Sequence, residues 1–116
     1  MDSPINQAHF ALVTDGDLDF AMELLQAYLE DTQVRMERIA QGIQDHDREL
    51  VCRSAHHLRG SSSNLGIVEM PQIAREMEMN PLSWEELGER LQRMRAIVQQ
   101  VQSYTDTLSA KVVSDR

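Results

Sequence analysis

The strongest constraint on the fold is a run of apolar residues near the end of the chain, spaced alternately four and three positions apart. The run consists of Leu87, Leu91, Met94, Val98, Val101, Thr105 and Leu108. Residues with this spacing lie on one side of an α-helix. Ser83, followed three residues later by Glu86, is typical of a capping box at a helix start. The sequence therefore predicts a long amphipathic helix that begins after Ser83.

A second long helix is predicted earlier in the chain, where apolar residues repeat every seven positions. The two sets of heptad positions are Leu18, Leu25, Thr32 and Ile39, and Met22, Leu29, Met36 and Ile43. Asp17 is suited to cap the start of this helix, and the polar segment around His46 is suited to end it. Each long helix therefore has one apolar seam that other helices must cover.

Shorter helices are expected to cover these seams. We expect an N-terminal helix from about Pro4 to Val13, a helix from near Asp47 to Gly66, and a short helix that ends before Asn80. The residues expected to face the core are Val51, Ala55, Leu58 and Ser62 in the second of these helices, and Met70, Ile73 and Met77 in the third. The predicted fold class is all-α, an antiparallel four-helix bundle with an additional short N-terminal helix.

The length of 116 residues indicates a single domain that spans residues 1–116. We expect residues from about 4 to 110 to be ordered and residues 111–116 to be frayed. Cys52 is the only cysteine, so an intrachain disulfide is excluded. The sequence has no apolar run of membrane-spanning length and no secretory signal at its start, so we expect a cytoplasmic protein.

The charge balance argues against several classes of partner. With 11 basic and 19 acidic residues, the chain has a net charge of −8, which would repel the backbone of a nucleic acid. Lys111 is the only lysine and the arginines are scattered, so no basic stretch suited to an anionic membrane surface is present. The sequence also lacks a nucleotide-binding glycine loop, which argues against ATP binding and self-phosphorylation.

The residues that packing does not explain are centred on His56. This histidine lies off the apolar stripe of its helix, so its imidazole is expected to project outward. Gly60 lies one turn later on the same side, where glycine costs a helix about 1 kcal/mol relative to alanine and leaves room for another protein. Arg59 can reach back over the imidazole and offer a fork of donors to phosphoryl oxygens. Ser61 and Ser63 keep the surroundings small and polar.

This combination suits the acceptance of a phosphoryl group by His56. A histidine with a pKa of roughly 6.5 is largely neutral at cytoplasmic pH, so one ring nitrogen has a lone pair that can attack phosphorus. Phosphoryl transfer also requires charge stabilisation, of which one helix supplies only a part. We expect the Mg²⁺ ion and the acidic residues to come from the partner, and we expect no cofactor or metal in this chain.

The segment from Ala55 to Ser62, Ala-His-His-Leu-Arg-Gly-Ser-Ser, resembles the signature of the histidine-containing phosphotransfer (HPt) domain family, and Asn64-Leu65-Gly66 is similar to its continuation. The resemblance implies that His56 is phosphorylated, that Arg59 occupies the Lys/Arg position, and that Gly60 permits docking of a receiver domain. It implies response-regulator receiver domains and a sensor histidine kinase, including a hybrid kinase, as partners, and a monomeric phosphocarrier without autokinase activity. In this interpretation, His56 takes phosphate from a receiver aspartate and passes it to another receiver.

One position departs from the family pattern. Several members carry a glutamine on the next helix that hydrogen-bonds near the active imidazole, and the corresponding residue here is Glu78. We hypothesise that Glu78 accepts a hydrogen bond from the imidazole and fixes its tautomer, although its charge would oppose a bound phosphoryl group. Because the register across Pro71 is open, Gln72 or Glu76 could take this place instead.

Two other function classes are weighed against phosphotransfer. The first is an adaptor bundle that binds receiver or kinase domains with an unused histidine, and the second is a metal-binding bundle enzyme. A metal site is disfavoured because Cys52 and His56 supply only two of the ligands that zinc requires. The remaining histidines, His9, His46 and His57, are interpreted as solvated or supporting residues. The apolar residues named for receiver docking are Ile5, Val13 and Leu65.

Overall fold

The structure is a computed structural model that describes residues 3–79 and 81–114. Five helices account for most of this part of the chain: α1 (Gln7–Thr14), α2 (Leu18–Gln44), α3 (Arg48–Leu65), α4 (Met70–Met79) and α5 (Trp84–Ser114). The only β-type pairing among the described residues is an isolated antiparallel bridge between Ile5 and Ile67. The prediction of an all-helical fold is therefore confirmed.

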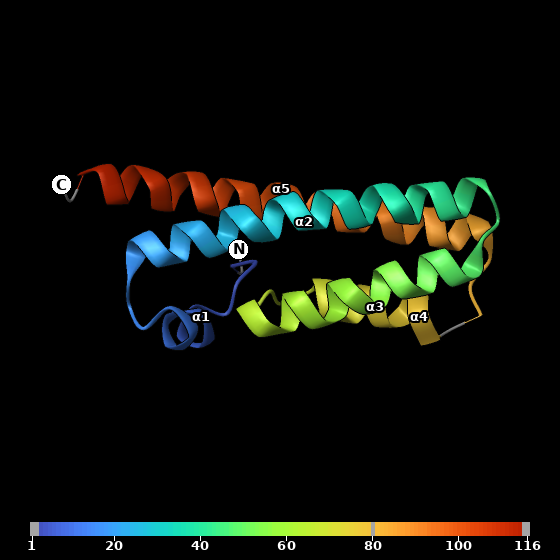
Figure 1. The fold of residues 1–116 in the computed structure, drawn as a ribbon, viewed down its shortest axis with the longest axis horizontal. Coiled ribbons are helices and arrows are strands. Elements are labelled where there is room, and N and C mark those ends of the chain that lie inside the picture. The colour runs from blue at the N-terminus through green and yellow to red at the C-terminus, as the bar shows by residue number, and fades with distance from the viewer. Residues whose placement is uncertain (1–2, 80, 115–116) are drawn as a thin grey trace.

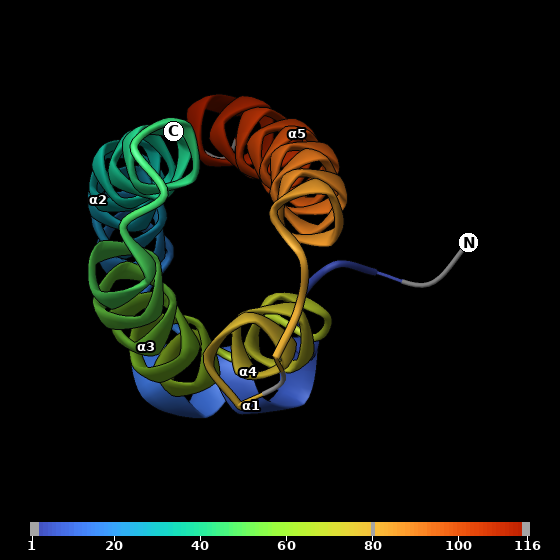
Figure 2. The same ribbon diagram turned by 90° about the vertical axis from the view of Figure 1, so that its right-hand side faces the viewer.

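The helices pack in a closed order around a shared core. α2 packs against α3 and α5, and α4 packs against the other sides of α3 and α5. Figure 2, which looks along the long axis, places these four helices around a common centre, and Figure 1 shows α1 beyond the end of α3. In Figure 1, α2 runs toward one end of the molecule and α3 returns from it, while the C-terminal part of α5 lies beside the start of α2. Residues of α3 are consequently flanked by α2 on one side and α4 on the other.

Local capping sets most helix boundaries. The side chains of Asp17 and Asp47 accept hydrogen bonds from backbone N–H groups in the first turns of α2 and α3, and Gly66 ends α3 with a φ of 79°. Ser83 and Glu86 form the predicted capping box, in which each side chain accepts from the other's backbone N–H at 3.1 Å. These bonds with Ser83 lower the pKa of the Glu86 carboxyl.

The start of α1 differs from the prediction. The helix begins at Gln7 rather than near Pro4 because the Asn6 side chain accepts the backbone N–H of His9 and caps it there. The chain before Asn6 is instead paired with the α3–α4 connection, and Ile5 is only 2% exposed. Ile5 and Leu65, which we had expected on a docking surface, are both buried, whereas Val13 is exposed.

The buried seams are broader than the heptad pattern predicts. In α5, Ile97 is buried, whereas Val98 and Leu108 are only partly buried. In α2, the buried set is Ala21, Leu25, Tyr28, Thr32, Met36, Ile39 and Gly42. A straight helix with 3.6 residues per turn drifts relative to a seven-residue repeat, so different heptad positions reach the core at different points along the helix.

The C-terminal end of α5 is longer than expected. The helix continues through Lys111 to Ser114, although we expected fraying from residue 111 onward. Helical hydrogen bonds form between near neighbours in the chain, so a helix can extend beyond its last packed residue. Residues 115–116 lie outside the described part. No helix in the described part is long and apolar enough to cross a membrane.

An aromatic cluster joins two connections at the end of the molecule where α2 meets α3. The His46 ring stacks on Trp84 with centroids 4.5 Å apart and an interplanar angle of 6°. The Arg48 guanidinium lies 4.3 Å from the centre of the Trp84 ring, and its Nη1 donates to the carbonyl oxygen of Leu82 at 2.8 Å. His46 is exposed, as expected, and its stacking on Trp84 also helps to fasten the α2–α3 turn to the start of α5.

Candidate functional site

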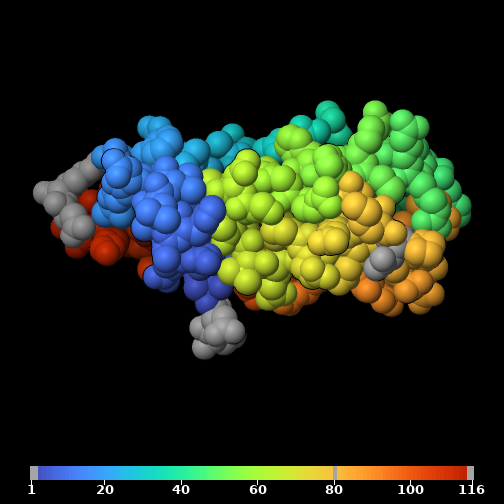
Figure 3. All heavy atoms as spheres, turned by 90° about the horizontal axis from the view of Figure 1, so that it is seen from below, coloured from blue at the N-terminus to red at the C-terminus, as the bar shows by residue number. Residues whose placement is uncertain are grey.

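Helix α3 presents His56 outward, as the sequence predicts. Its buried residues are Val51, Ser54, Ala55, Leu58, Ser62 and Leu65, which face the core. The His56 side chain is 63% exposed and projects from the opposite part of the helix. Figure 3 shows α3 lying beside α4 on one broad side of the molecule, with α1 next to them. A partner can therefore approach the imidazole from this side.

The packing of α4 on α3 brings Glu78 to His56. The Nδ1 atom of His56 lies 2.7 Å from Oε1 of Glu78, whose side chain is only 17% exposed. The two alternatives are engaged elsewhere, since Gln72 donates to Glu76 and Glu76 binds Arg90 of α5. Glu78 is therefore the residue of α4 that contacts the imidazole.

The contacts around Nδ1 define which ring nitrogen is available. Nη2 of Arg59 also lies 3.3 Å from Nδ1 of His56, but one nitrogen cannot donate to the carboxylate and accept from the guanidinium at once. The 2.7 Å contact with a carboxylate assigns the proton to Nδ1, which donates to Glu78. The Nε2 atom then carries the lone pair of the neutral imidazole. In this tautomer Nε2 can act as the nucleophile.

Arg59 is held beside the ring by the same carboxylate. Its Nη1 atom lies 3.2 Å from Oε2 of Glu78, so the glutamate uses one oxygen for His56 and the other for the guanidinium. Because a guanidinium has five N–H donors, this ion pair leaves others free for phosphoryl oxygens. Glu78 thus contacts both His56 and Arg59.

The space above Gly60 is open. A Cβ atom placed on Gly60 would meet no atom within 4 Å, so the packing of this chain does not require a glycine there. The residue lies in the middle of α3, where glycine weakens a helix. This observation fits a position kept small for contact with another molecule.

The three serines after Gly60 have different environments. Ser61 donates to the carbonyl oxygen of Leu58 at 3.4 Å, and Ser63 is exposed. Ser62, by contrast, is buried, as its place on the apolar stripe predicts, and its Oγ lies 2.7 Å from the Tyr28 hydroxyl of α2. Burial raises the pKa of Tyr28. The Tyr28–Ser62 bond was not predicted, because no local pattern pairs residues 34 positions apart.

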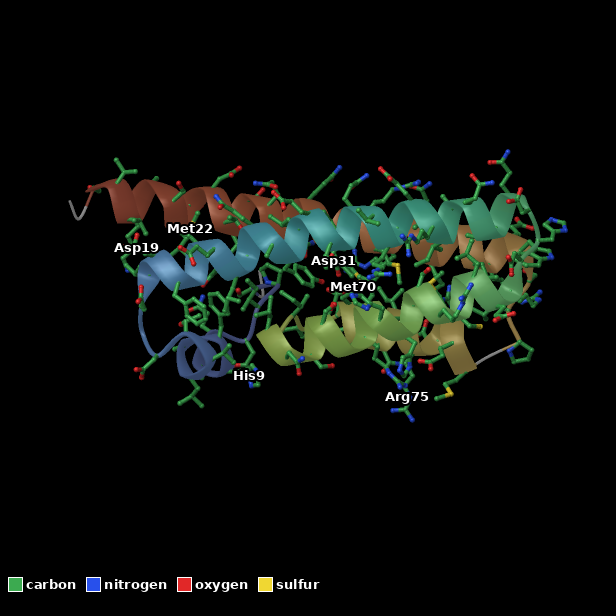
Figure 4. All side chains as sticks on the ribbon, in the orientation of Figure 1. His9, Asp19, Met22, Asp31, Met70 and Arg75 are labelled. Carbon is green, nitrogen blue, oxygen red and sulfur yellow. The ribbon has the colours of Figure 1, made fainter. Side chains whose placement is uncertain are left out.

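His57 is engaged in a separate contact on the α2 side of α3. Its Nε2 atom lies 2.8 Å from Oδ2 of Asp31, and Oδ1 of Asp31 lies 3.4 Å from Nε of Arg35. Figure 4 labels Asp31 at the edge of α2 that faces α3. No local sequence pattern indicates this contact, because it depends on the rotation of α2 relative to α3.

A comparison with protein-family models matches residues 23–104 to the Hpt domain. The chain belongs to the HPt domain family. The match covers well over half of the chain and includes His56, Arg59, Gly60 and Glu78. A search of curated proteins found no match. HPt domains are phosphocarriers rather than classical enzymes, and they act in phosphorelay signalling with receiver domains and histidine kinases.

The part of this HPt domain that the structure describes has no group of three or more His, Cys, Asp or Glu side chains that could hold a metal ion. The Cys52 thiol, one turn before His56, is directed to the backbone of α4, with Sγ 4.0 Å from the carbonyl oxygen of Met77. Cys52 therefore packs at the α3–α4 contact instead of pairing with the histidine.

Proposed function

We propose that this HPt domain accepts a phosphoryl group on Nε2 of His56 from the phosphorylated aspartate of one receiver domain and passes it to another. The observation that carries the proposal is the 2.7 Å contact between Nδ1 of His56 and Oε1 of Glu78, made by a histidine side chain that is largely exposed. The contact holds the proton of the neutral ring on Nδ1 and leaves the lone pair on Nε2.

The transfer step follows from this geometry. The Nε2 lone pair of His56 attacks phosphorus, a P–N bond forms, and the P–O bond to the aspartate carboxylate breaks, with the electron pair returning to the carboxylate. The ring keeps its Nδ1 proton and gains positive charge, which the Glu78 carboxylate stabilises. Transfer to the next receiver reverses these changes. Glu78 is thus a positioning residue that also balances charge on the ring.

Arg59 and Gly60 support this step in different ways. The free donors of the Arg59 guanidinium offset the negative charge of the phosphoryl oxygens. Glycine at position 60 leaves room for the receiver to bring its aspartate close to the ring. We propose supporting roles for Ser61 and Ser63, whose small side chains do not obstruct the approach of a partner to His56. The receiver supplies Mg²⁺ and the acidic residues that hold it.

We further propose that the helices form an antiparallel four-helix bundle with α1 as an additional short helix, and that the chain is one domain that acts as a monomer. The packing order of α2, α3, α4 and α5 around one core supports this interpretation. The phosphate is supplied by receivers in a relay that starts at a sensor histidine kinase, including a hybrid kinase, and the chain does not phosphorylate itself.

The test is to incubate the protein with phosphorylated receiver domains and Mg²⁺, and to look for phosphate that is labile in acid and stable in alkali. We expect label on the wild type and on His57→Gln, and none on His56→Gln. His57→Gln is the matched control because it changes an adjacent histidine on the same helix. Label that survives in His56→Gln would overturn the assignment. No label from a panel of receivers would favour the adaptor interpretation.

A further inference from the structure

The surface around His56 differs in charge from the rest of the molecule. The whole chain has a net charge of −8, yet residues 50–68 contain no aspartate or glutamate and include Arg53 and Arg59. Most of this segment belongs to α3. The helix that carries the proposed phosphoacceptor is therefore free of acidic side chains after its first turn.

Three exposed arginines lie on this segment and on the two helices that flank it. They are Arg38 of α2, Arg53 of α3 and Arg75 of α4. Among the described residues, none of the three has an ion-pair or hydrogen-bond partner. Unpaired cations of this kind are available to an anionic partner.

Helix geometry places all three near His56. Arg53 lies three residues before His56 on the outer side of α3. Arg38 lies two turns after Asp31, which contacts His57, and two turns of helix span about 10 Å. Arg75 lies three residues before Glu78, which contacts His56. Figure 4 shows Arg75 projecting away from the helices into solvent.

The acidic residues that contact His56 and His57 are already matched by cations. Asp31 contacts His57 and Arg35, and Glu78 contacts His56 and Arg59. Glu69, which precedes α4, and Glu76 of α4 pair with Arg93 and Arg90 of α5. The carboxylates in contact with the two histidines therefore add no unmatched negative charge beside His56, and the exposed Glu37 and Glu49 lie toward the α2–α3 turn.

We propose that Arg38, Arg53 and Arg75 form a cationic docking surface that steers the acidic phosphorylation site of a receiver domain to His56. This inference rests on the proposed function. A receiver site combines an aspartyl phosphate with the carboxylates that bind Mg²⁺, so it presents the complementary charge. A standard interface covers roughly 800 Å² on each partner, which is wide enough to include all three arginines.

The steering acts on association rather than on chemistry. Complementary charge raises association rates by roughly 10- to 1,000-fold, and the gain falls as salt screens the charges. None of the three arginines is assigned a contact with the phosphoryl group. Their removal is therefore expected to slow the encounter and to leave transfer within the complex unchanged.

The test uses a receiver domain that labels His56, and compares wild type with the triple variant Arg38→Glu, Arg53→Glu and Arg75→Glu by rapid-quench phosphotransfer. At about 0.01 M salt we expect each reversal to lower the second-order rate constant about fivefold, and the maximal rate at saturating receiver to stay unchanged. At about 1 M salt the difference is expected to shrink to about twofold or less.

Arg95→Glu is the matched control, because Arg95 is exposed and unpaired among the described residues and lies on α5, which does not pack against α3. A triple variant that is no slower than Arg95→Glu, or a loss that persists at high salt, would overturn the inference. Binding of a DNA duplex that the triple variant abolishes would assign the surface to another partner. Failure of the proposed function is distinguishable, since His56 would then carry no label in any protein.

Discussion

His56 and His57 are neighbours on one helix, and each is held by a carboxylate from a different flanking helix. Glu78 of α4 contacts Nδ1 of His56, whereas Asp31 of α2 contacts Nε2 of His57. The first contact leaves the outer ring nitrogen free, and the second occupies it. Two identical side chains with similar partners therefore differ in the atom that they can offer to an incoming phosphoryl group.

The contrast teaches that the presence of a carboxylate beside a histidine is not sufficient for nucleophilic chemistry. The decisive point is which nitrogen the carboxylate holds, because the other nitrogen then carries the lone pair. On α3, the choice follows from the side on which each residue lies: His56 faces α4 and His57 faces α2. The variants below test this contrast.

The largest expected effect comes from Gly60→Gln, which places a side chain in the open space beside His56. We expect the transfer rate at low receiver concentration to fall about 100-fold, since the added side chain keeps the receiver aspartate from the ring. Helix content by circular dichroism should be unchanged. Gly88→Gln on α5 is the control, because Gly88 also has open space above it. This variant should transfer phosphate at the wild-type rate. Equal behaviour of the two variants would contradict the docking role of Gly60.

The next effect concerns the charge beside His56. Glu78→Gln keeps an oxygen that can accept from Nδ1, but it removes the negative charge that stabilises the ring during transfer and holds Arg59. We expect single-turnover transfer to slow about tenfold, which corresponds to about 1.4 kcal/mol in the barrier. Glu76→Gln, two residues earlier on the same helix, should have little effect. Unchanged rates and phosphohistidine lifetime in Glu78→Gln would remove the proposed role.

A smaller effect is expected inside the core beneath the site. Ser62→Ala removes the partner of the buried Tyr28 hydroxyl and should lower the free energy of unfolding by about 1–2 kcal/mol. Urea unfolding measures this loss. Tyr28→Phe with Ser62→Ala should recover part of it, because both polar groups are then absent. Additive losses in the double variant would show that the bond contributes little.

The smallest effect is expected on the His57 side. Asp31→Asn removes the negative charge from an exposed contact, so the free energy of unfolding should change by less than about 1 kcal/mol and His56 should be labelled at the wild-type rate. Thermal unfolding and the transfer assay check both statements. A strong loss of His56 labelling in this variant would mean that the two histidines do not act separately.

The features that sequence analysis predicted are those encoded over a few residues. The caps at Asp17, Asp47 and Gly66 are local, and the apolar spacing identified four of the five helices closely. The outward position of His56 followed from the same periodicity. The contact with Glu78 could be hypothesised only through the family resemblance, since it joins residues of two helices that are 22 positions apart in the sequence.

The features that were missed depend on how helices pack against one another. The heptad pattern does not specify the rotation of a helix precisely, so Ile97 and not Val98 is buried. The Asp31–His57 and Tyr28–Ser62 contacts require the relative rotation of α2 and α3. Ile5 was misplaced for a similar reason: its burial depends on pairing with Ile67, which lies far along the chain.

The stacking of His46 on Trp84 provides an intrinsic fluorescent probe of unfolding. Trp84, the only tryptophan, is the first residue of α5, and its ring contacts His46 of the α2–α3 turn and Arg48 at the start of α3. Its emission therefore reports whether that end of the helices remains assembled. Because this cluster includes none of the residues assigned to transfer, unfolding can be followed optically in every variant above without a label near His56.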